Sequence, residues 1–320
     1  MTSTPSSHVV RGATPGIRRR IVAYKDLAKL TEWGAFLSVP LVWSLLDSHH
    51  WTAPRTFAIL LLSLATQAGV RTAESALDDV AGVRDGIDVV NYAEASPHRA
   101  RGRKPLLDMR LTEAQARRYA YTAAATGVVA FVIAFAVAGF APFWAPLTAA
   151  FAATLVVTYS WGPKLSYHGG QELIVISGVA VSVITTFGLI EHSLTWPPVI
   201  EGLIMGIWLM QPVTFANMHD LDGDRQAGRQ TMAVRLSAAA NRRYILALFG
   251  LAWTIFVAAL ATGQLRWWFV LCLVPCMAIQ SRALRAGVWG ENFLLARRAC
   301  HLAYRIGFVG FFCANLIQFH

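Results

Sequence analysis

The sequence is poor in charged residues. Only 14% of its 320 residues are charged and 55% are hydrophobic, whereas about 25% of a typical soluble domain is charged. Apolar runs long enough to cross a bilayer recur along nearly the whole chain. The composition therefore excludes an ordinary soluble protein and predicts an all-α, polytopic membrane protein.

Cysteines and acidic residues are also few. The four cysteines lie in or beside apolar runs and lack the spacing of a metal-binding pair, which favours small buried apolar residues. The 28 lysines and arginines outnumber the 18 acidic residues, and the net charge is +10. Because the basic residues cluster between the apolar runs, this charge is typical of cytoplasmic loops and does not indicate a nucleic-acid partner.

The N-terminus lacks the short apolar core and small-residue cleavage site of a signal peptide. Residues 1–20 are rich in Ser, Thr, Pro and Gly and end in a basic run. We expect residues 1–28 to form a disordered, basic cytoplasmic tail and residues 29–320 to form a single transmembrane domain.

Nine apolar segments have the length of a membrane span. Short connections with little charge alternate with long basic ones, and 24 of the 28 lysines and arginines lie in the tail, in the long connections or at adjoining helix ends. The positive-inside rule then predicts a cytoplasmic N-terminus and an external C-terminus, across a bacterial inner membrane. The segments are residues 31–47, 56–78, 116–140, 143–160, 171–191, 198–219, 243–262, 266–284 and 299–318.

An acidic cluster follows the sixth segment. Asn217, Asp220 and Asp224 are spaced i, i+3, i+7, so a helix places their side chains on one face. Clustered carboxylates repel each other without a cation, and such oxygens suit Mg²⁺ that also binds a phosphate substrate. Arg225 and Arg229 follow and are candidates for binding the phosphate oxygens. The alternative is a solvated, charged helix end.

Another acidic cluster, which is the first along the chain, ends the second segment. Arg71, Glu74 and Asp78 share a helical face at the same spacing, and Asp79 follows. Ionisable residues inside a span are costly and mark functional or paired sites. A purely structural ion pair between Arg71 and Glu74 is the alternative. The alternation of basic loops predicts that both clusters lie on the cytoplasmic side.

The loop after the second segment holds more charged residues. We interpret Asp85 and Asp88 as loop residues, which reach a metal site only if the loop folds back. Lys104 ends a basic run. This run is either a solvated cytoplasmic loop or, in one or two of its residues, a lid that binds a diphosphate.

Three motifs, in order along the chain, resemble the UbiA-type intramembrane prenyltransferase superfamily. The run NMHDLDGDRQAGRQT at 217–231 resembles its second Asp-rich motif, and RKPL at 103–106 resembles its basic-Pro-Leu signature. The run YSWGPK at 159–164 resembles the loop between spans four and five, closest to the menaquinone-biosynthesis branch. The first Asp-rich motif departs from the family pattern, since Asp78 stands at its Asn position and Gly82 and Gly86 at two of its Asp positions.

The resemblance implies a nine-helix bundle with a cytoplasm-facing active site that ionises a polyprenyl diphosphate (C10–C20 or longer) and transfers the prenyl group to an aromatic acceptor. It implies Mg²⁺ held by Asp78, Asp79, Asp220 and Asp224. The altered first motif leaves open a cyclase, which closes the prenyl chain on itself, and a non-catalytic transporter or scaffold is a third alternative. The substrate-binding residues implied are Arg71, Glu74, Lys104, Tyr159, Lys164, Asn217, Arg225 and Arg229.

Overall fold

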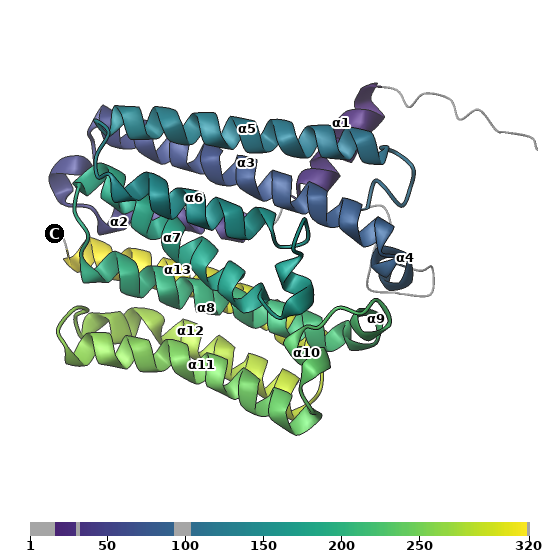
Figure 1. The fold of residues 1–320 in the computed structure, drawn as a ribbon. Coiled ribbons are helices and arrows are strands. Elements are labelled where there is room, and N and C mark those ends of the chain that lie inside the picture. The colour runs from purple at the N-terminus through teal and green to yellow at the C-terminus, as the bar shows by residue number, and fades with distance from the viewer. Residues whose placement is uncertain (1–16, 30–32, 93–103, 319–320) are drawn as a thin grey trace, which may run out of the picture.

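The apolar segments form helices in the computed structural model, which describes residues 17–29, 33–92 and 104–318 (Figure 1). No strand occurs among these residues. The α-helices are α1 Ile17–Ala28, α2 Ser38–Leu45, α3 Pro54–Arg84, α4 Ile87–Asn91, α5 Glu113–Val137, α6 Trp144–Val157, α7 Gln171–Glu191, α8 Trp196–His219, α9 Leu221–Gln226, α10 Met232–Arg235, α11 Ala238–Ala261, α12 Trp268–Leu284 and α13 Phe293–Gln318. Short 3₁₀ turns are η1 Trp33–Leu37, η2 Ser48–His50 and η4 Leu165–His168, and the π-helical turn η5 Arg285–Trp289 extends α12.

Within the described ranges, seven helices are long and apolar enough to cross a membrane: α3, α5, α7, α8, α11, α13, and α12 together with its π-helical turn. The predicted segment 143–160 contains the 14-residue α6, and segment 31–47 contains the five-residue η1 and the eight-residue α2. Both are shorter than the roughly 20 residues that a span needs. The all-α, polytopic fold is therefore confirmed, whereas the count of nine spans is not.

Local sequence signals explain where several helices begin. α3 has Pro54 in its first turn, where a missing N–H removes no helical hydrogen bond. α5 begins with a capping box, in which Gln115 N donates to Thr112 Oγ1 (3.3 Å) and Thr112 N donates to Gln115 Oε1 (2.9 Å). Ser237 Oγ caps α11 by accepting from Ala240 N (3.3 Å). The caps at Thr112 and Ser237 fix where the preceding loops pass into α5 and α11.

The helices α3 and α5 run side by side and approach each other very closely (Figure 1). A Cβ on Gly69 of α3 would stand 2.5 Å from the carbonyl oxygen of Ala123 and 2.7 Å from Cα of Gly127, both in α5. Only a residue without a side chain fits there, and small residues allow membrane helices to pack backbone against backbone. The contact packs α3, which carries the first acidic cluster, directly against α5.

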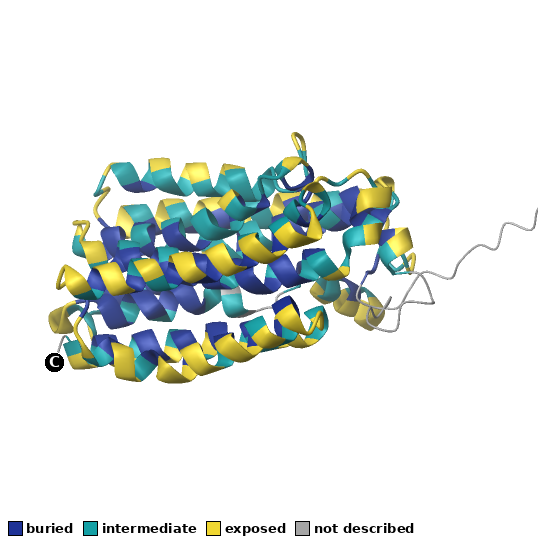
Figure 2. Ribbon diagram, turned by 90° about the horizontal axis from the view of Figure 1, so that it is seen from below, coloured by how far each residue is buried: buried dark blue, intermediate teal, exposed yellow. Residues whose placement is uncertain are grey.

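The interior of the bundle is centred on α8, the most buried of the seven membrane-length helices, and α5 is the least buried. Trp208 and Phe215 of α8 are almost completely buried. The outer faces of the long helices are exposed (Figure 2), and they carry large apolar side chains such as Val129, Leu251 and Leu271. An outer surface of this kind is expected for a protein in contact with lipid.

Several short helices gather at one end of the bundle: α1, α4, α9 and α10 lie there, and the end of α13 lies at the opposite end (Figure 1). The helix α1 corrects the prediction of a disordered tail for residues 17–28. Its Ala23 and Leu27 are buried in one apolar cluster with Leu77 and Val80 of α3, and this packing stabilises a helix that composition alone did not suggest. Residues 1–16 lie outside the described ranges, and the side of the membrane that each terminus faces stays a prediction.

Candidate active site

The helix α3 is longer than the membrane is thick. Its 31 residues rise about 46 Å at ~1.5 Å per residue, whereas the hydrocarbon core of a bilayer is about 30 Å. Its last turns therefore bring Asp78 and Asp79 to the end of the bundle where α4 and α9 lie (Figure 1).

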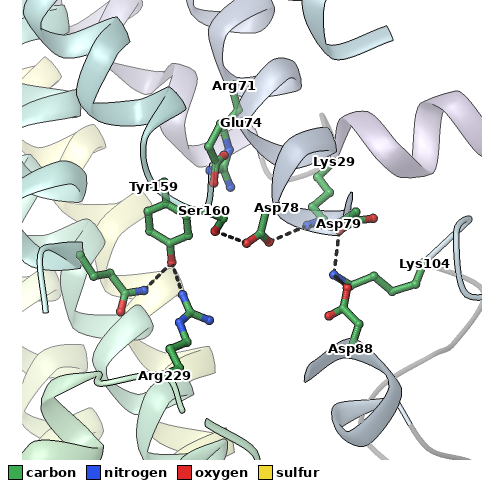
Figure 3. Close-up of polar contacts among 11 residues, drawn as sticks. Lys29, Arg71, Glu74, Asp78, Asp79, Asp88, Lys104, Tyr159, Ser160 and Arg229 are labelled. Carbon is green, nitrogen blue, oxygen red and sulfur yellow. Dashed lines mark hydrogen bonds and ion pairs between the residues drawn. The ribbon is translucent and has the colours of Figure 1, made fainter. Parts of the chain in front are cut away.

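Two lysines from outside α3 bind the carboxylates of this first cluster (Figure 3). Lys104 Nζ lies 2.7 Å from Asp79 Oδ1 and 2.8 Å from Asp88 Oδ2. Lys29 Nζ lies 2.9 Å from Asp79 Oδ1 and 3.6 Å from Asp78 Oδ2. Burial lowers the pKa of both lysines, and Lys29 further lowers that of Lys104, yet the carboxylates, Asp79 foremost, raise both above the ordinary lysine pKa. Both side chains are therefore charged ammonium groups.

Asp78 connects this lysine-bound group to the loop between α6 and α7. Its Oδ1 accepts a hydrogen bond from Ser160 Oγ (2.6 Å), which follows α6, and its Oδ2 faces Lys29 (Figure 3). One turn earlier on α3, Arg71 donates to the buried Glu74. This is the ion pair that the sequence offered as a structural alternative, and it does not exclude a further role for either residue.

The chain turns back immediately after α3. Gly86 adopts a positive φ of 76°, and α4 starts there. The interpretation of Asp88 as a loop residue is wrong, because it lies in the first turn of α4 and its buried carboxylate binds Lys104. Burial raises the pKa of Asp88, and Lys104 offsets only part of that shift. Asp85 is bound by Lys164 Nζ at 2.7 Å.

Arg229 lies against two tyrosine rings, next to the second acidic cluster. Its guanidinium carbon is 5.7 Å from the ring centre of Tyr159 and 5.3 Å from that of Tyr167. Its Nη2 donates to Tyr159 Oη at 3.0 Å (Figure 3). The same hydroxyl accepts from Gln171 Nε2 (2.7 Å), and Gln171 Oε1 accepts from Asn217 Nδ2 (2.7 Å). This chain of hydrogen bonds connects the loops after α6 and α9 to the start of α7 and the end of α8.

The second acidic cluster lies where α8 passes into α9. Asp220 and Asp224 stand on adjacent turns, since Asp224 N donates to the Asp220 carbonyl oxygen at 2.9 Å. Asp224 is buried, and Thr231 Oγ1 lies 3.3 Å from its Oδ2. Asp222 is exposed and lies 3.8 Å from Arg225, which is also exposed. The structure therefore does not bring Arg225 to the other predicted phosphate-binding residues, because position 225 falls on the outer face of the short α9.

Arg229 is within electrostatic reach of both acidic clusters. Burial lowers its pKa, but Tyr159, Asp224 and Asp78 raise it above the ordinary arginine pKa. Its Nε is buried and has no hydrogen-bond partner among the described residues. Buried donors are almost always paired, and the oxygen of a phosphate or carboxylate is the partner that a guanidinium suits best. The geometry therefore fits an anionic ligand between the two clusters.

The short helices that follow the two clusters contact each other. A Cβ on Gly223 of α9 would stand 2.2 Å from Asn91 Oδ1 of α4. The contact places α4, which holds Asp88, against α9, which holds Asp224.

The two clusters differ in how they fit the Mg²⁺ that the resemblance implies. In the described part of the chain, no three His, Cys, Asp or Glu side chains come together as a ligand set. Asp220 and Asp224 offer carboxylates on adjacent turns, which suits a cation that also takes oxygens from a phosphate substrate. At the α3 side, ammonium groups already bind Asp79 Oδ1 and Asp88 Oδ2. The residues fit a divalent cation at the α8–α9 side and do not fit one at the α3 side.

Sequence reasoning missed Lys29, Ser160 and Gln171 as members of this site. The YSWGPK run contains Ser160 but did not single it out, and each of the three residues reaches the site through a contact distant in sequence. One signal was present for Asp88. Gly82 stands where the family pattern has an acid, and a Cβ there would lie 2.5 Å from Asp88 Oδ2.

A comparison with protein families identifies this chain. The model described as the UbiA prenyltransferase family matches residues 36–292. A curated relative, the 1,4-dihydroxy-2-naphthoate octaprenyltransferase of Haemophilus influenzae, is 28% identical over 132 residues, which are 40% of this chain and 42% of that protein. The alignment thus spans less than half of the relative.

Three solved structures share the fold. One reported for digeranylgeranylglyceryl phosphate synthase in membranes has a TM-score of 0.65 at 14% identity and covers 93% of this chain and 99% of its own. The UbiA homologue of Aeropyrum pernix K1 has a TM-score of 0.61 at 18% identity and covers 89% and 97%. The UbiA homologue of Archaeoglobus fulgidus bound to GPP and Mg²⁺ has a TM-score of 0.58 at 12% identity and covers 92% and 99%. Since the family match covers most of the chain and these neighbours share its helical architecture, the protein belongs to the UbiA prenyltransferase family.

Proposed function

We propose that the protein is a Mg²⁺-dependent prenyltransferase of a bacterial inner membrane, which transfers the prenyl group of a polyprenyl diphosphate to an aromatic acceptor. Membership of the UbiA prenyltransferase family supports the reaction class. The Archaeoglobus fulgidus homologues bound to GPP or DMAPP with Mg²⁺ support the donor and the metal. The name of the Haemophilus influenzae relative supports an acceptor such as 1,4-dihydroxy-2-naphthoate.

The observation that carries the proposal is the placement of Arg229. A charged guanidinium with an unpartnered buried Nε lies within electrostatic reach of Asp78 and Asp224. Such a group suits a diphosphate that lies between the two acidic clusters, because a purely structural arginine at this position would have its buried donors paired.

In the proposed reaction, the bond between C1 of the prenyl chain and the diphosphate oxygen breaks, and the electron pair leaves with the diphosphate. The allylic C1 then bonds to a ring carbon of the acceptor, which releases its proton to water or to the departing diphosphate. A divalent cation held by Asp220 and Asp224, with Asn217 on the preceding turn, would supply charge neutralisation to the leaving group.

We assign the binding and orientation of the diphosphate to other side chains of the protein. Arg229 binds the diphosphate, and Tyr159 orients the guanidinium through its hydroxyl. Lys164 and Arg71 are further cations that we assign to the diphosphate. Lys104 is bound on two sides by carboxylates, which supports a positioning role for it. The apolar interior of the bundle excludes water from the allylic cation.

The test uses the purified full-length protein in lipid nanodiscs with Mg²⁺ and geranyl, farnesyl or geranylgeranyl diphosphate, each with and without 1,4-dihydroxy-2-naphthoate. Pyrophosphate release and product masses are measured. We expect pyrophosphate and a prenylated naphthoate only when the acceptor is present. Removal of Mg²⁺ by EDTA should abolish both, and its return should restore them.

Two other outcomes separate the alternatives. A cyclic hydrocarbon or terpene alcohol formed without acceptor would replace transfer with cyclisation. No pyrophosphate with any donor, from a protein that elutes as a single folded species, would point to a non-catalytic carrier. Asp224→Asn and Asp222→Asn form a matched pair for the reaction, because the first residue is buried at the site and the second is exposed. Only the first should lose activity.

A further inference from the structure

The protein itself neutralises most of the negative charge of the first acidic cluster. Three carboxylates, Asp78, Asp79 and Asp88, share two ammonium groups, Lys29 and Lys104, at 2.7 to 3.6 Å (Figure 3). Three negative and two positive charges leave one net negative charge, and Asp78 also accepts a hydrogen bond from Ser160. This is an internal salt-bridge network with good geometry.

Three side chains of this network are buried, and the absence of a side chain at Gly82 leaves room for one of them. Lys104 and Asp79 are buried, Asp88 is 6% exposed, and Lys104 Nζ also lies 5.2 Å from the ring centre of Tyr92. At Gly82, a Cβ would stand 2.5 Å from Asp88 Oδ2 and 2.6 Å from its Cγ. The carboxylate of Asp88 therefore occupies the space that an acidic side chain at position 82 would need.

We propose that the ammonium groups of Lys29 and Lys104 neutralise the carboxylates of α3 and α4 in place of a divalent cation, so that the protein binds metal through the α8–α9 carboxylates alone. Each ammonium carries a fixed charge and donors directed at the oxygens that a metal would coordinate. A divalent cation at this cluster would have to displace them or lie beside them against like-charge repulsion. The inference rests on the proposed function, because it concerns the metal of that reaction.

One oxygen offers a direct check on this reasoning. Asp79 Oδ2 is buried and has no hydrogen-bond partner among the described residues. If a cation binds the first cluster, this atom is its natural ligand, and removing its charge by Asp79→Asn should then change the number of ions bound. If the lysines serve as the cations, Asp79→Asn leaves that number unchanged.

The experiment counts bound metal. The full-length protein in detergent micelles is dialysed to equilibrium against Mn²⁺, with the same concentration of a thiolo-diphosphate analogue of geranyl diphosphate on both sides, and bound Mn²⁺ is quantified by atomic emission. We expect one ion per chain. Asp224→Asn should abolish binding, and Asp79→Asn should keep one ion. Two ions per chain in the unmodified protein, loss of an ion in Asp79→Asn, or no ion at all would each overturn the proposal.

A second variant tests the lysine directly. Lys104→Met keeps the apolar stem and removes the ammonium that Asp79 and Asp88 share. Asp88 then has no cation and Asp79 keeps only Lys29, so we expect a second ion to bind. Lys25→Met, at an exposed lysine of α1, is the matched control and should keep one ion. If Lys104→Met still binds one ion, the ammonium is not what excludes the cation and the proposal fails.

A replacement variant covers the case in which Lys104→Met does not fold, and a parallel turnover measurement separates this inference from the proposed function. If Lys104→Met does not fold, Lys104→Gln removes the charge and keeps an N–H donor for Asp79 and Asp88. It should also bind a second ion, and one ion in this variant would count against the proposal. Turnover of geranyl diphosphate is measured in parallel. One ion without turnover would sink the proposed function and leave the lysine inference standing, whereas two ions with turnover would do the reverse.

Discussion

Replacing Arg229 by lysine tests whether the shape of the guanidinium, and not only its charge, matters. Arg229 Nη2 donates to Tyr159 Oη at 3.0 Å, and the group contacts the rings of Tyr159 and Tyr167. A lysine at position 229 keeps the positive charge. It loses the planar fork, and with it the simultaneous contact with the hydroxyl, both rings and a diphosphate oxygen.

The size of the effect follows from these contacts. A hydrogen bond from a charged donor contributes about 1.5–3 kcal/mol, and the part of the ring contacts that an ammonium does not reproduce adds about 0.5–1 kcal/mol. If these contacts orient the group for the leaving diphosphate, Arg229→Lys loses about 2–4 kcal/mol of transition-state stabilisation. At 1.36 kcal/mol per tenfold change, this is roughly a 30- to 1,000-fold fall in kcat/KM.

The assay is continuous pyrophosphate release in nanodiscs under the donor and acceptor conditions that support turnover. Arg225→Lys is the control, because Arg225 is exposed and pairs only loosely with Asp222 at 3.8 Å. It should stay within twofold of the unmodified protein. Tyr159→Phe removes only the hydroxyl and should fall between the two. If Arg229→Lys keeps activity within twofold, or if Arg225→Lys is as damaging, the assignment of Arg229 to the diphosphate is wrong.

Four other predictions follow from the structure. Asp220→Ala and Asp224→Ala should each remove nearly all turnover without unfolding the protein. Asp222 is exposed, so Asp222→Ala should keep its turnover. An inactive Asp222→Ala together with an active Asp220→Ala would contradict the assignment of the helical face. Asp88→Asn should lower the free energy of unfolding by about 2 kcal/mol, because the buried hydrogen bond from Lys104 loses its charged acceptor. Unchanged thermal unfolding in detergent would argue against it. Gly69→Ala should destabilise the protein by about 1–3 kcal/mol through overpacking against α5, whereas Gly250→Ala, with no atom within 4 Å of the new Cβ, should not; equal melting temperatures would refute the contact. Tags at the N-terminus and after His320 should report the cytoplasmic and the external side respectively, and two tags on one side would mean that the span count is wrong.

Residues close together in sequence made the second cluster predictable. Helical periodicity correctly indicated a turn between Asp220 and Asp224, since Asp224 N donates to the Asp220 carbonyl oxygen. The helix is interrupted at Asp220, where α8 passes into α9, and the shared face of the three side chains stays a prediction. Arg225 shows the limit of the same argument. Its position next to the motif suggested a phosphate ligand, but the turn into the short α9 leaves it exposed.

The first cluster could not be derived from local patterns. Lys29 and Asp79 are fifty residues apart in the chain, and Lys104 reaches Asp79 and Asp88 from the far side of a long connection. The pairing of charges across loops depends on tertiary contacts that hydrophobic periodicity does not describe. Hydropathy has a similar limit for α2 and α6, because an apolar run shows that a segment is buried in protein or lipid but not that it crosses the bilayer.

The contact at Gly69 has a consequence for the order of assembly. The helices α3 and α5 are consecutive membrane-length helices, and the atoms nearest to a Cβ on Gly69 belong to Ala123 and Gly127 of α5, so this contact can form once α5 has been synthesised. A backbone-to-backbone contact of this kind needs no later helix to stabilise it. We therefore expect the pair to associate in the bilayer while the ribosome is still translating the second half of the chain. The helix that carries Asp78 and Asp79 would then be in place before α8 arrives with Asp220.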